Sequence, residues 1–274
     1  MIDVENTKPE RDFRVDEQIT LDDVKRKYEL NEAITGRVLS FNLKEKIIRV
    51  SLGNSIVGTL PFNEVCLEDL KFIEGTPAQV KTIYKKKIIR AKVTAIDGKN
   101  IYLSRKQNLL DVFTELKKRG LAFFNATIEN AGKYNIFCDI AEGIIAYCSV
   151  EELSRVYIDD ARDWVTIGNH IRVRITKYND PESLVWCSAK KAAMGNYKII
   201  KPRTKIMAKI GKPIKNENGM VTGYFVEITP AIAGIADVRE DYGPKKEYKL
   251  GEMVECYVRN VDAKKHRVKL FLEN

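Results

Sequence analysis

Two phenylalanines occupy equivalent places in segments that alternate between apolar and polar residues. Val226 and Ile228 share one parity and should point inward, whereas Phe225 has the opposite parity, and Phe137 has the same setting. Alternate residues of a strand face opposite sides of its sheet, so both phenylalanines should face outward. An outward ring on a polar sheet face can stack on a nucleic-acid base. A loop or connecting helix covering each ring is the alternative.

The strands that close each repeat carry further outward side chains. By the same alternation, Tyr102, Trp186 and Lys269 face outward on these strands. Trp186 and Tyr102 could also stack on bases, and packing against the neighbouring connecting segments is an equally good interpretation of both rings.

Two basic stretches could hold phosphates. Lys85, Lys86 and Lys87 are followed by Arg90 in a stretch of the first repeat that is longer than its counterparts. Alternating Ile and Val around it predict an extended hairpin that projects as an arm, with phosphate contacts that would depend on salt. A solvated turn is the alternative. The second stretch leads into the third repeat and consists of Lys198, Lys201, Arg203, Lys205, Lys209 and Lys212.

No constellation for catalysis or for metal binding is present in the sequence. It has no phosphate-binding glycine loop, no nucleophile elbow and no pair of metal-ligating histidines on a helix. The five cysteines are scattered and never form a CxxC pair, and His170 and His266 are far apart. We therefore expect reduced core thiols, no metal, no cofactor and no enzymatic activity.

Composition describes a globular chain that favours an anionic partner. The 274 residues are 44% apolar and 31% charged, and 47 Lys plus Arg against 38 Asp plus Glu give a net charge of +9. These values exclude a disordered or collagenous chain. No apolar stretch reaches the roughly 18 residues of a membrane helix, and the first residues are polar. We expect a cytosolic protein without a membrane partner.

The elements that position these residues repeat three times. Each repeat begins with a short alternating strand, carries a second strand and turn in one ungapped register, and places a glycine before its fourth strand. The first strands are 34–38, 124–128 and 206–210, and the glycines are Gly75, Gly168 and Gly251. Strict alternation between turns predicts half-buried antiparallel sheet. Five strands in so short a unit suit a small closed barrel, which leaves no exposed sheet edge.

The connections between repeats differ. An apolar stripe through Leu109, Val112 and Leu116 predicts a helix that ends at Gly120. Thr20 with Asp23 three residues later resembles a capping box before a short helix. The connection over 194–204 is predicted to be extended and more pliable.

These features divide the chain into six segments. We expect an N-terminal arm and short helix over 1–30, a divergent first repeat over 31–107, a linker helix over 108–120, a second repeat over 121–192, a linker over 193–205 and a third repeat over 206–274. The predicted fold is mainly β, with three tandem five-stranded OB-fold barrels joined by short helices or linkers.

The third repeat resembles the S-one RNA-binding repeat, the OB-fold barrel named after a large ribosomal protein of the bacterial small subunit. The residues that carry the resemblance are Gly223-Tyr-Phe-Val-Glu-Ile, Gly234-Ile-Ala-Asp, Leu250-Gly251, Val261-Asp262 and His266-Arg-Val-Lys-Leu270. In outline it covers the chain from Ile34 to the C-terminus. The sequence departs from the family's pattern at its third-strand histidine, which is Pro61, Ser149 and Asp237 in the three repeats, and at the second-strand aromatic of the first repeat, which is Arg49.

The resemblance implies RNA-binding residues, strongest in the third repeat. We assign RNA binding to Phe225, Tyr224, Arg267, Asp262, Phe137, Lys209, Lys269 and Trp186, and candidate phosphate or ribosome contacts to Arg49, Lys85, Lys86, Lys87 and Arg90.

The resemblance further implies a single-stranded RNA-binding protein that captures mRNA at the small ribosomal subunit in translation. We expect it to be a monomer, with the small subunit or a ribosomal protein as its partner. The alternative is an adaptor that docks on a ribosomal or RNA-decay protein and binds RNA weakly, a role that Arg49 favours for the first repeat.

Overall fold

The computed structural model describes Pro9 and residues 13–67, 84–179, 184–193, 195–238 and 247–272. The chain forms two compact units. One consists of Met1–Ala122, Asp139–Ala146 and Lys177–Val185, and the other of Phe123–Cys138, Tyr147–Thr176 and Trp186–Asn274.

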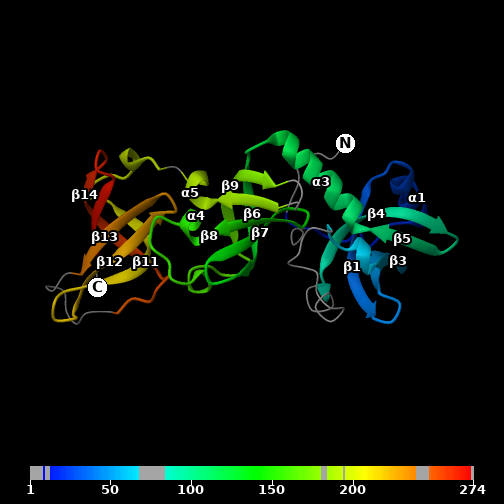
Figure 1. Cartoon of the computed structure of the whole chain (residues 1–274), viewed down its shortest axis with the longest axis horizontal. Coiled ribbons are helices and arrows are strands. Elements are labelled where there is room, and N and C mark those ends of the chain that lie inside the picture. Colours follow the sequence, from blue (N-terminus) through cyan, green and yellow to red (C-terminus); the bar gives the residue numbers. More distant parts are fainter. Residues whose placement is uncertain are drawn as a thin grey trace. The chain divides into compact units, whose positions relative to one another are not determined.

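The strands form three closed five-stranded barrels, which confirms the predicted fold (Figure 1). The first barrel has β1 (Ala33–Asn42), β2 (Ile47–Gly53), β3 (Ile56–Pro61), β4 (Ile88–Asp97) and β5 (Asn100–Ser104). The middle barrel has β6 (Phe123–Ala131), β7 (Asn135–Ala141), β8 (Ile144–Ser149), β9 (His170–Asn179) and β10 (Leu184–Ser188). The third has β11 (Lys205–Lys215), β12 (Val221–Thr229), β13 (Ile232–Val238), β14 (Met253–Asp262) and β15 (Arg267–Leu272).

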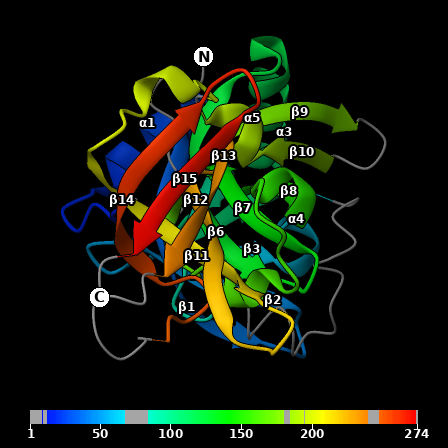
Figure 2. The same ribbon diagram turned by 90° about the vertical axis from the view of Figure 1, so that its left-hand side faces the viewer.

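The strand order is the same in the first and third barrels. Three strands form an antiparallel meander, and the fifth strand pairs in parallel with the third and antiparallel with the fourth. Figure 2 shows β14 and β15 side by side in the third barrel. Closure pairs every strand on both sides, so no edge of the sheet is left unpaired.

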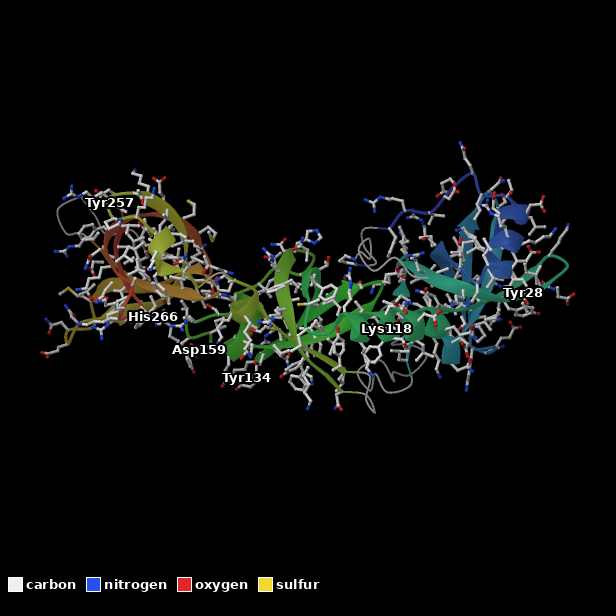
Figure 3. All side chains as sticks on the ribbon, turned by 90° about the horizontal axis from the view of Figure 1, so that it is seen from above. Tyr28, Lys118, Tyr134, Asp159, Tyr257 and His266 are labelled. Carbon is white, nitrogen blue, oxygen red and sulfur yellow. The ribbon has the colours of Figure 1, made fainter. Side chains whose placement is uncertain are left out.

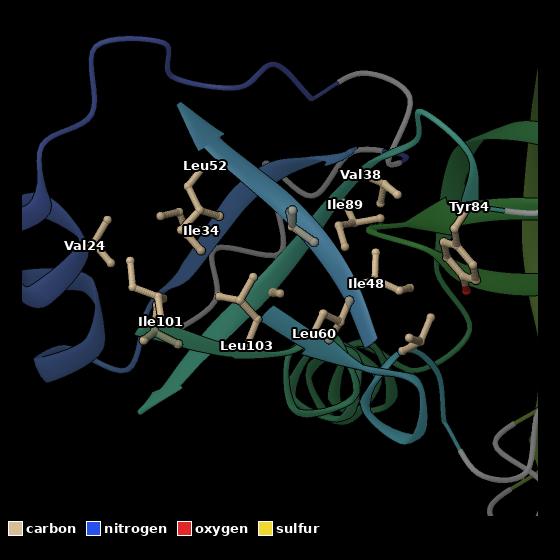
Figure 4. Close-up of a cluster of buried hydrophobic side chains, with 14 of the residues drawn as sticks. Val24, Ile34, Val38, Ile48, Leu52, Leu60, Tyr84, Ile89, Ile101 and Leu103 are labelled. Carbon is tan, nitrogen blue, oxygen red and sulfur yellow. The ribbon is translucent and has the colours of Figure 1, made fainter. Parts of the chain in front are cut away.

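Each barrel interior is filled by the inward half of its alternating strands. In the first barrel Ile48, Val50 and Leu52 of β2 are 0–1% exposed and meet Leu60 of β3. Figure 4 shows Ile48, Leu52 and Leu60 in this cluster of buried side chains, with Tyr84 among its members. The inward direction of Val226 is confirmed by its burial, and the residues at equivalent places of the other two barrels are buried as well: Val50, Leu52, Cys138 and Ile140.

Two helices form where their caps were expected. Helix α1 (Leu21–Glu29) starts at Thr20, which exchanges both hydrogen bonds of a capping box with Asp23. Helix α3 (Arg105–Arg119) begins earlier than its apolar stripe because the Ser104 hydroxyl accepts a hydrogen bond from the Gln107 N–H. It ends at Gly120, whose φ of 69° few other residues adopt.

The first barrel differs from its predicted shape around the basic run. Lys85 and Lys86 lie in a tight turn, and the residues after them form β4, the barrel's own fourth strand, which pairs with β1. The alternating residues after the basic run therefore belong to the closed barrel and not to a projecting arm, and the predicted first half of that arm lies outside the described residues. The fourth strand expected after Gly75 lies outside the described residues. Gly168 and Gly251 precede β9 and β14 as predicted.

The connection to the third barrel is less extended than predicted. Helix α5 (Ala189–Ala192) follows β10, and a 3-10 turn, η5, spans Tyr197–Ile199. Tyr197 is 4% exposed and belongs to the core of the third barrel. This ring fixes the connection to the barrel that it precedes.

Candidate nucleic-acid interface

In each barrel, outward residues from the second, third and fifth strands lie side by side in a row across the sheet. In the first barrel Arg49 is paired with Thr59, and Thr59 with Tyr102. In the third barrel Phe225 is paired with Ile235, and Ile235 with Lys269. Paired residues point to the same side of a sheet. We call these three-residue sets the stacking rows.

The stacking row of the middle barrel consists of three aromatic side chains. The ring of Phe137 lies 5.9 Å from that of Tyr147 at 74°, and Tyr147 lies 4.5 Å from Trp186 at 66°. Trp186 is 38% exposed, and the other two rings are half-buried. Edge-to-face contacts hold each ring in place while part of its surface faces solvent. The row is a preformed aromatic surface on β7, β8 and β10.

The third barrel has a stacking row of mixed character. Phe225 is 44% exposed and Ile235 38% exposed, while Lys269 is open to solvent. Arg267 is exposed two residues earlier on β15. Asp262 is paired with Arg267, and its carboxylate accepts the N–H groups of the β14–β15 turn, so it orders the turn. The row offers one ring with two cations beside it.

The stacking row of the first barrel is mostly polar. The Arg49 guanidinium donates a hydrogen bond of 2.9 Å to the Thr59 hydroxyl, and Tyr102 is 40% exposed. Lys85 and Lys86 are exposed, and Lys87 is half-buried with its ammonium 5.7 Å from the Tyr84 ring. This barrel offers cations and a single ring.

Two side chains near the stacking rows are buried. Tyr224 is 4% exposed because it shares the inward parity of Val226, and its hydroxyl accepts the Tyr248 N–H, so the ring is part of the core. Asp139 shares the outward parity of Phe137, yet it is 1% exposed, because its carboxylate accepts the Gly143 N–H at 3.0 Å across the β7–β8 turn.

Lys209, which the sequence assigns to RNA binding, does not extend into solvent. Its ammonium donates to the Trp164 carbonyl oxygen and lies 4.4 Å from the centre of the Trp164 ring. Burial lowers the pKa of Lys209 and raises the pKa of Glu227, its partner across β11 and β12. These groups border a 430 Å³ cavity within the second unit. Lys209 therefore fastens the third barrel to Trp164 instead of presenting a free cation.

Arg90 is likewise engaged by the protein. Its guanidinium donates to the Glu142 carboxylate at 2.5 Å and lies 5.1 Å from the Phe13 ring. Glu142 therefore already balances the charge of Arg90, and the assignment of Arg90 to phosphate contacts stays a prediction.

Sequence reasoning missed Tyr147, the central ring of the middle row. A signal was present, because the third strands align without gaps and Tyr147 stands where Thr59 and Ile235 stand. The neighbours of this ring come from two other strands, and only the closed barrel brings them together.

The described residues contain no group of three or more His, Cys, Asp or Glu placed to hold a metal ion. Cys138, Cys148, Cys187 and Cys256 are buried free thiols and Cys66 is partly buried. In the part of the chain that the structure describes, no helix has the length and apolar character needed to cross a membrane.

Comparison with known proteins finds ribosomal relatives. The chain is 25% identical over 248 residues to "Small ribosomal subunit protein bS1" of Staphylococcus haemolyticus, and 21% identical over 237 residues to the protein of the same name from Rickettsia conorii. These alignments cover 84% and 80% of this chain but only 61% and 39% of the relatives. No family model matches the chain.

Among solved structures, a multidomain protein with nucleic acid binding domains from Streptococcus pneumoniae is 12% identical, with a TM-score of 0.30. The aligned region covers 89% of this chain and 74% of the Streptococcus pneumoniae chain.

Proposed function

Since the chain is an S-one-like protein of OB-fold barrels, we propose that it binds single-stranded RNA, with mRNA at the small ribosomal subunit as its target. The observation that carries the proposal is the middle stacking row of Phe137, Tyr147 and Trp186. Aromatic surfaces on OB-fold sheets bind bases by stacking, which requires bases that are not paired in a duplex.

The setting in translation rests on the relatives. Both are named as proteins of the small ribosomal subunit, and the net charge of +9 suits a partner rich in RNA. The polar row of the first barrel supports a narrower division of labour. With Arg49 bound to Thr59 and one ring at Tyr102, this barrel would dock on a larger partner while the other two bind bases.

The proposal is tested by the binding of a fluorescent, unstructured RNA of about 12 nucleotides and of the matching duplex. We expect the single strand to bind more tightly. Trp186→Ala and Phe225→Ala should each weaken that binding by about 1 to 3 kcal/mol, the cost of losing one stacked base.

Tyr134→Ala is the matched control, because Tyr134 is a 62% exposed ring of the same barrel that lies outside the row. Equal binding of duplex and single strand, or equal losses for Trp186→Ala and Tyr134→Ala, would refute base stacking on the row. Cosedimentation with small subunits then tests the ribosomal setting separately.

A further inference from the structure

A basic pocket in the second unit is lined by residues outside the stacking rows. It has a volume of 350 Å³, and its lining includes Arg155, Arg174, Lys190, Lys191 and His266, with Tyr197 beside them. Among the described residues that line it, none is acidic. Ligand pockets begin at about 300 Å³, so the space is large enough for a small group to enter.

The walls of the pocket are held in place by the fold. The Arg155 N–H donates to the Pro230 carbonyl oxygen at 3.0 Å, and the Lys191 N–H donates to the Ser188 hydroxyl at 3.0 Å. The Arg174 guanidinium lies 5.5 Å from the Phe123 ring. These contacts fix the backbone at Arg155 and Lys191 and orient the Arg174 side chain before any ligand arrives.

An aromatic pair forms another wall. His266, labelled in Figure 3, stacks on Tyr197 with 5.0 Å between ring centres and 19° between planes. Tyr197 is buried, and His266 is exposed. The outer face of the imidazole is therefore available to pack against a ribose or a base.

The charge of the pocket is largely unbalanced. Lys191 has a partner in Glu152 at 3.7 Å, an ion pair that is largely exposed and therefore weak. Within the described part of the chain, neither Arg155 nor Lys190 forms an ion pair. Like charges gathered in a concave site raise its affinity for anions.

We propose that this pocket binds backbone phosphates of the RNA strand whose bases stack on the middle row, a role that rests on the proposed function. Lys190 and Lys191 belong to α5, which begins three residues after Trp186. A strand stacked on Trp186 would therefore continue towards these cations. The ligand class is a phosphodiester chain rather than a single small anion, because several separate cations surround the space.

The test compares Arg155→Gln/Lys190→Gln with a matched control, Lys215→Gln/Lys249→Gln. Both double variants remove two positive charges, and Lys215 and Lys249 are exposed residues outside the pocket lining. Each protein is titrated with unstructured RNA of about 4 and about 12 nucleotides, between about 50 and 200 mM salt. Circular dichroism checks that both variants fold.

We expect the pocket variant to bind the longer RNA about tenfold more weakly than the wild type. The slope of log affinity against log salt should be smaller by about 1.4, because each of two lost phosphate contacts contributes about 0.7. The short RNA, which reaches little beyond the stacking row, should bind the variant nearly as well as the wild type. The control should retain both affinity and slope.

Equal losses in the pocket variant and the control would overturn the proposal. A second result would also overturn it: the wild type binds inorganic phosphate tightly, the pocket variant does not, and both bind the longer RNA equally well. The pocket would then bind a free anion. If the wild type fails to bind either RNA, the proposed function itself is wrong, which is a different outcome.

Discussion

Lys209 and Lys269 both occupy outward positions on strands of the third barrel, yet only Lys269 is open to solvent. Lys209 lies over the Trp164 ring and donates to its carbonyl oxygen. A cation–π contact with partial burial favours a fixed side chain, and burial lowers the pKa of Lys209. The two lysines therefore differ in role because of their surroundings.

Tyr178 gives a residue-scale prediction with a defined pH dependence. Its hydroxyl donates to the Leu116 carbonyl oxygen at 3.0 Å, and burial raises its pKa to about 12. An unfolded tyrosine ionises near pH 10, so between about pH 10 and 12 the unfolded chain loses a proton that the folded chain keeps. The stability that this group contributes is complete below about pH 10 and is lost as the pH rises towards 12.

Tyr178→Phe should accordingly lower the free energy of unfolding by about 1 kcal/mol near neutral pH, the usual contribution of one hydrogen bond. The difference from wild type should shrink as the pH rises above about 10. Denaturant unfolding of both proteins at about pH 8 and about pH 11 measures it. A difference that stays constant or grows with pH would contradict the burial of this hydroxyl.

Side-chain direction could be predicted from the sequence, while side-chain partners could not. Alternation correctly placed Phe225, Trp186 and Lys269 on the outer faces. It gave no information about Trp164 over Lys209 or Glu142 beside Arg90, because those partners are distant in sequence. Parity also predicts the burial of Tyr224, whose assignment to RNA binding rests only on the resemblance to the family.

At the scale of elements, two glycines show two different reasons why a turn needs this residue: a left-handed backbone, and the lack of space for a side chain. Gly53 ends β2 with φ of 109°, and a Cβ there would lie 2.0 Å from the Asp16 carbonyl oxygen. Gly219, in the β11–β12 turn, has φ of 77° and open space around it. Alanine at either position incurs the cost of a left-handed backbone, and only at Gly53 does it also collide with the main chain.

We therefore expect Gly219→Ala to destabilise its hairpin by about 1 to 2 kcal/mol, and Gly53→Ala to cost a further 1 to 3 kcal/mol or so in the first barrel. Hydrogen exchange of peptides from β2 and β12 measures the opening free energy at each place. Similar losses at both sites would show that the arm around Asp16 moves aside easily.

The strands were predictable because each alternates within a few residues, but barrel closure is not a local property. In the first barrel the glycine signal pointed to a fourth strand after Gly75, whereas the strand that closes the barrel is β4, in which Ala33 of β1 is paired with Lys92. The sequence offers two alternating segments for the fourth strand of this barrel. The pairing with β1 and β5 identifies the one that forms it.

At the scale of the whole molecule, contacts link successive barrels within each unit. In the first unit the buried Glu142 carboxylate accepts from Arg90 of β4 and from Asn108 of α3. In the second unit Lys212 pairs with Asp159 at 2.7 Å, close to the contact of Lys209 with Trp164. These contacts favour barrels that unfold together with their neighbours, whereas the sequence had suggested a pliable third connection.

Glu142→Gln tests this coupling. Glu142 is 2% exposed, and glutamine keeps its size while removing the charge that holds Arg90. We expect a loss of about 1.5 to 3 kcal/mol, the value of hydrogen bonds to a charged group. Both tryptophans, Trp164 and Trp186, lie in the middle repeat, so their fluorescence reports the unfolding of that repeat together with the loss of the Lys209 contact at Trp164. The fluorescence transition should move to lower denaturant concentration in Glu142→Gln and stay unchanged in Glu151→Gln, an exposed control. A middle repeat that unfolds at the same denaturant concentration in both variants would mean that the link to Arg90 and Asn108 contributes nothing to its stability.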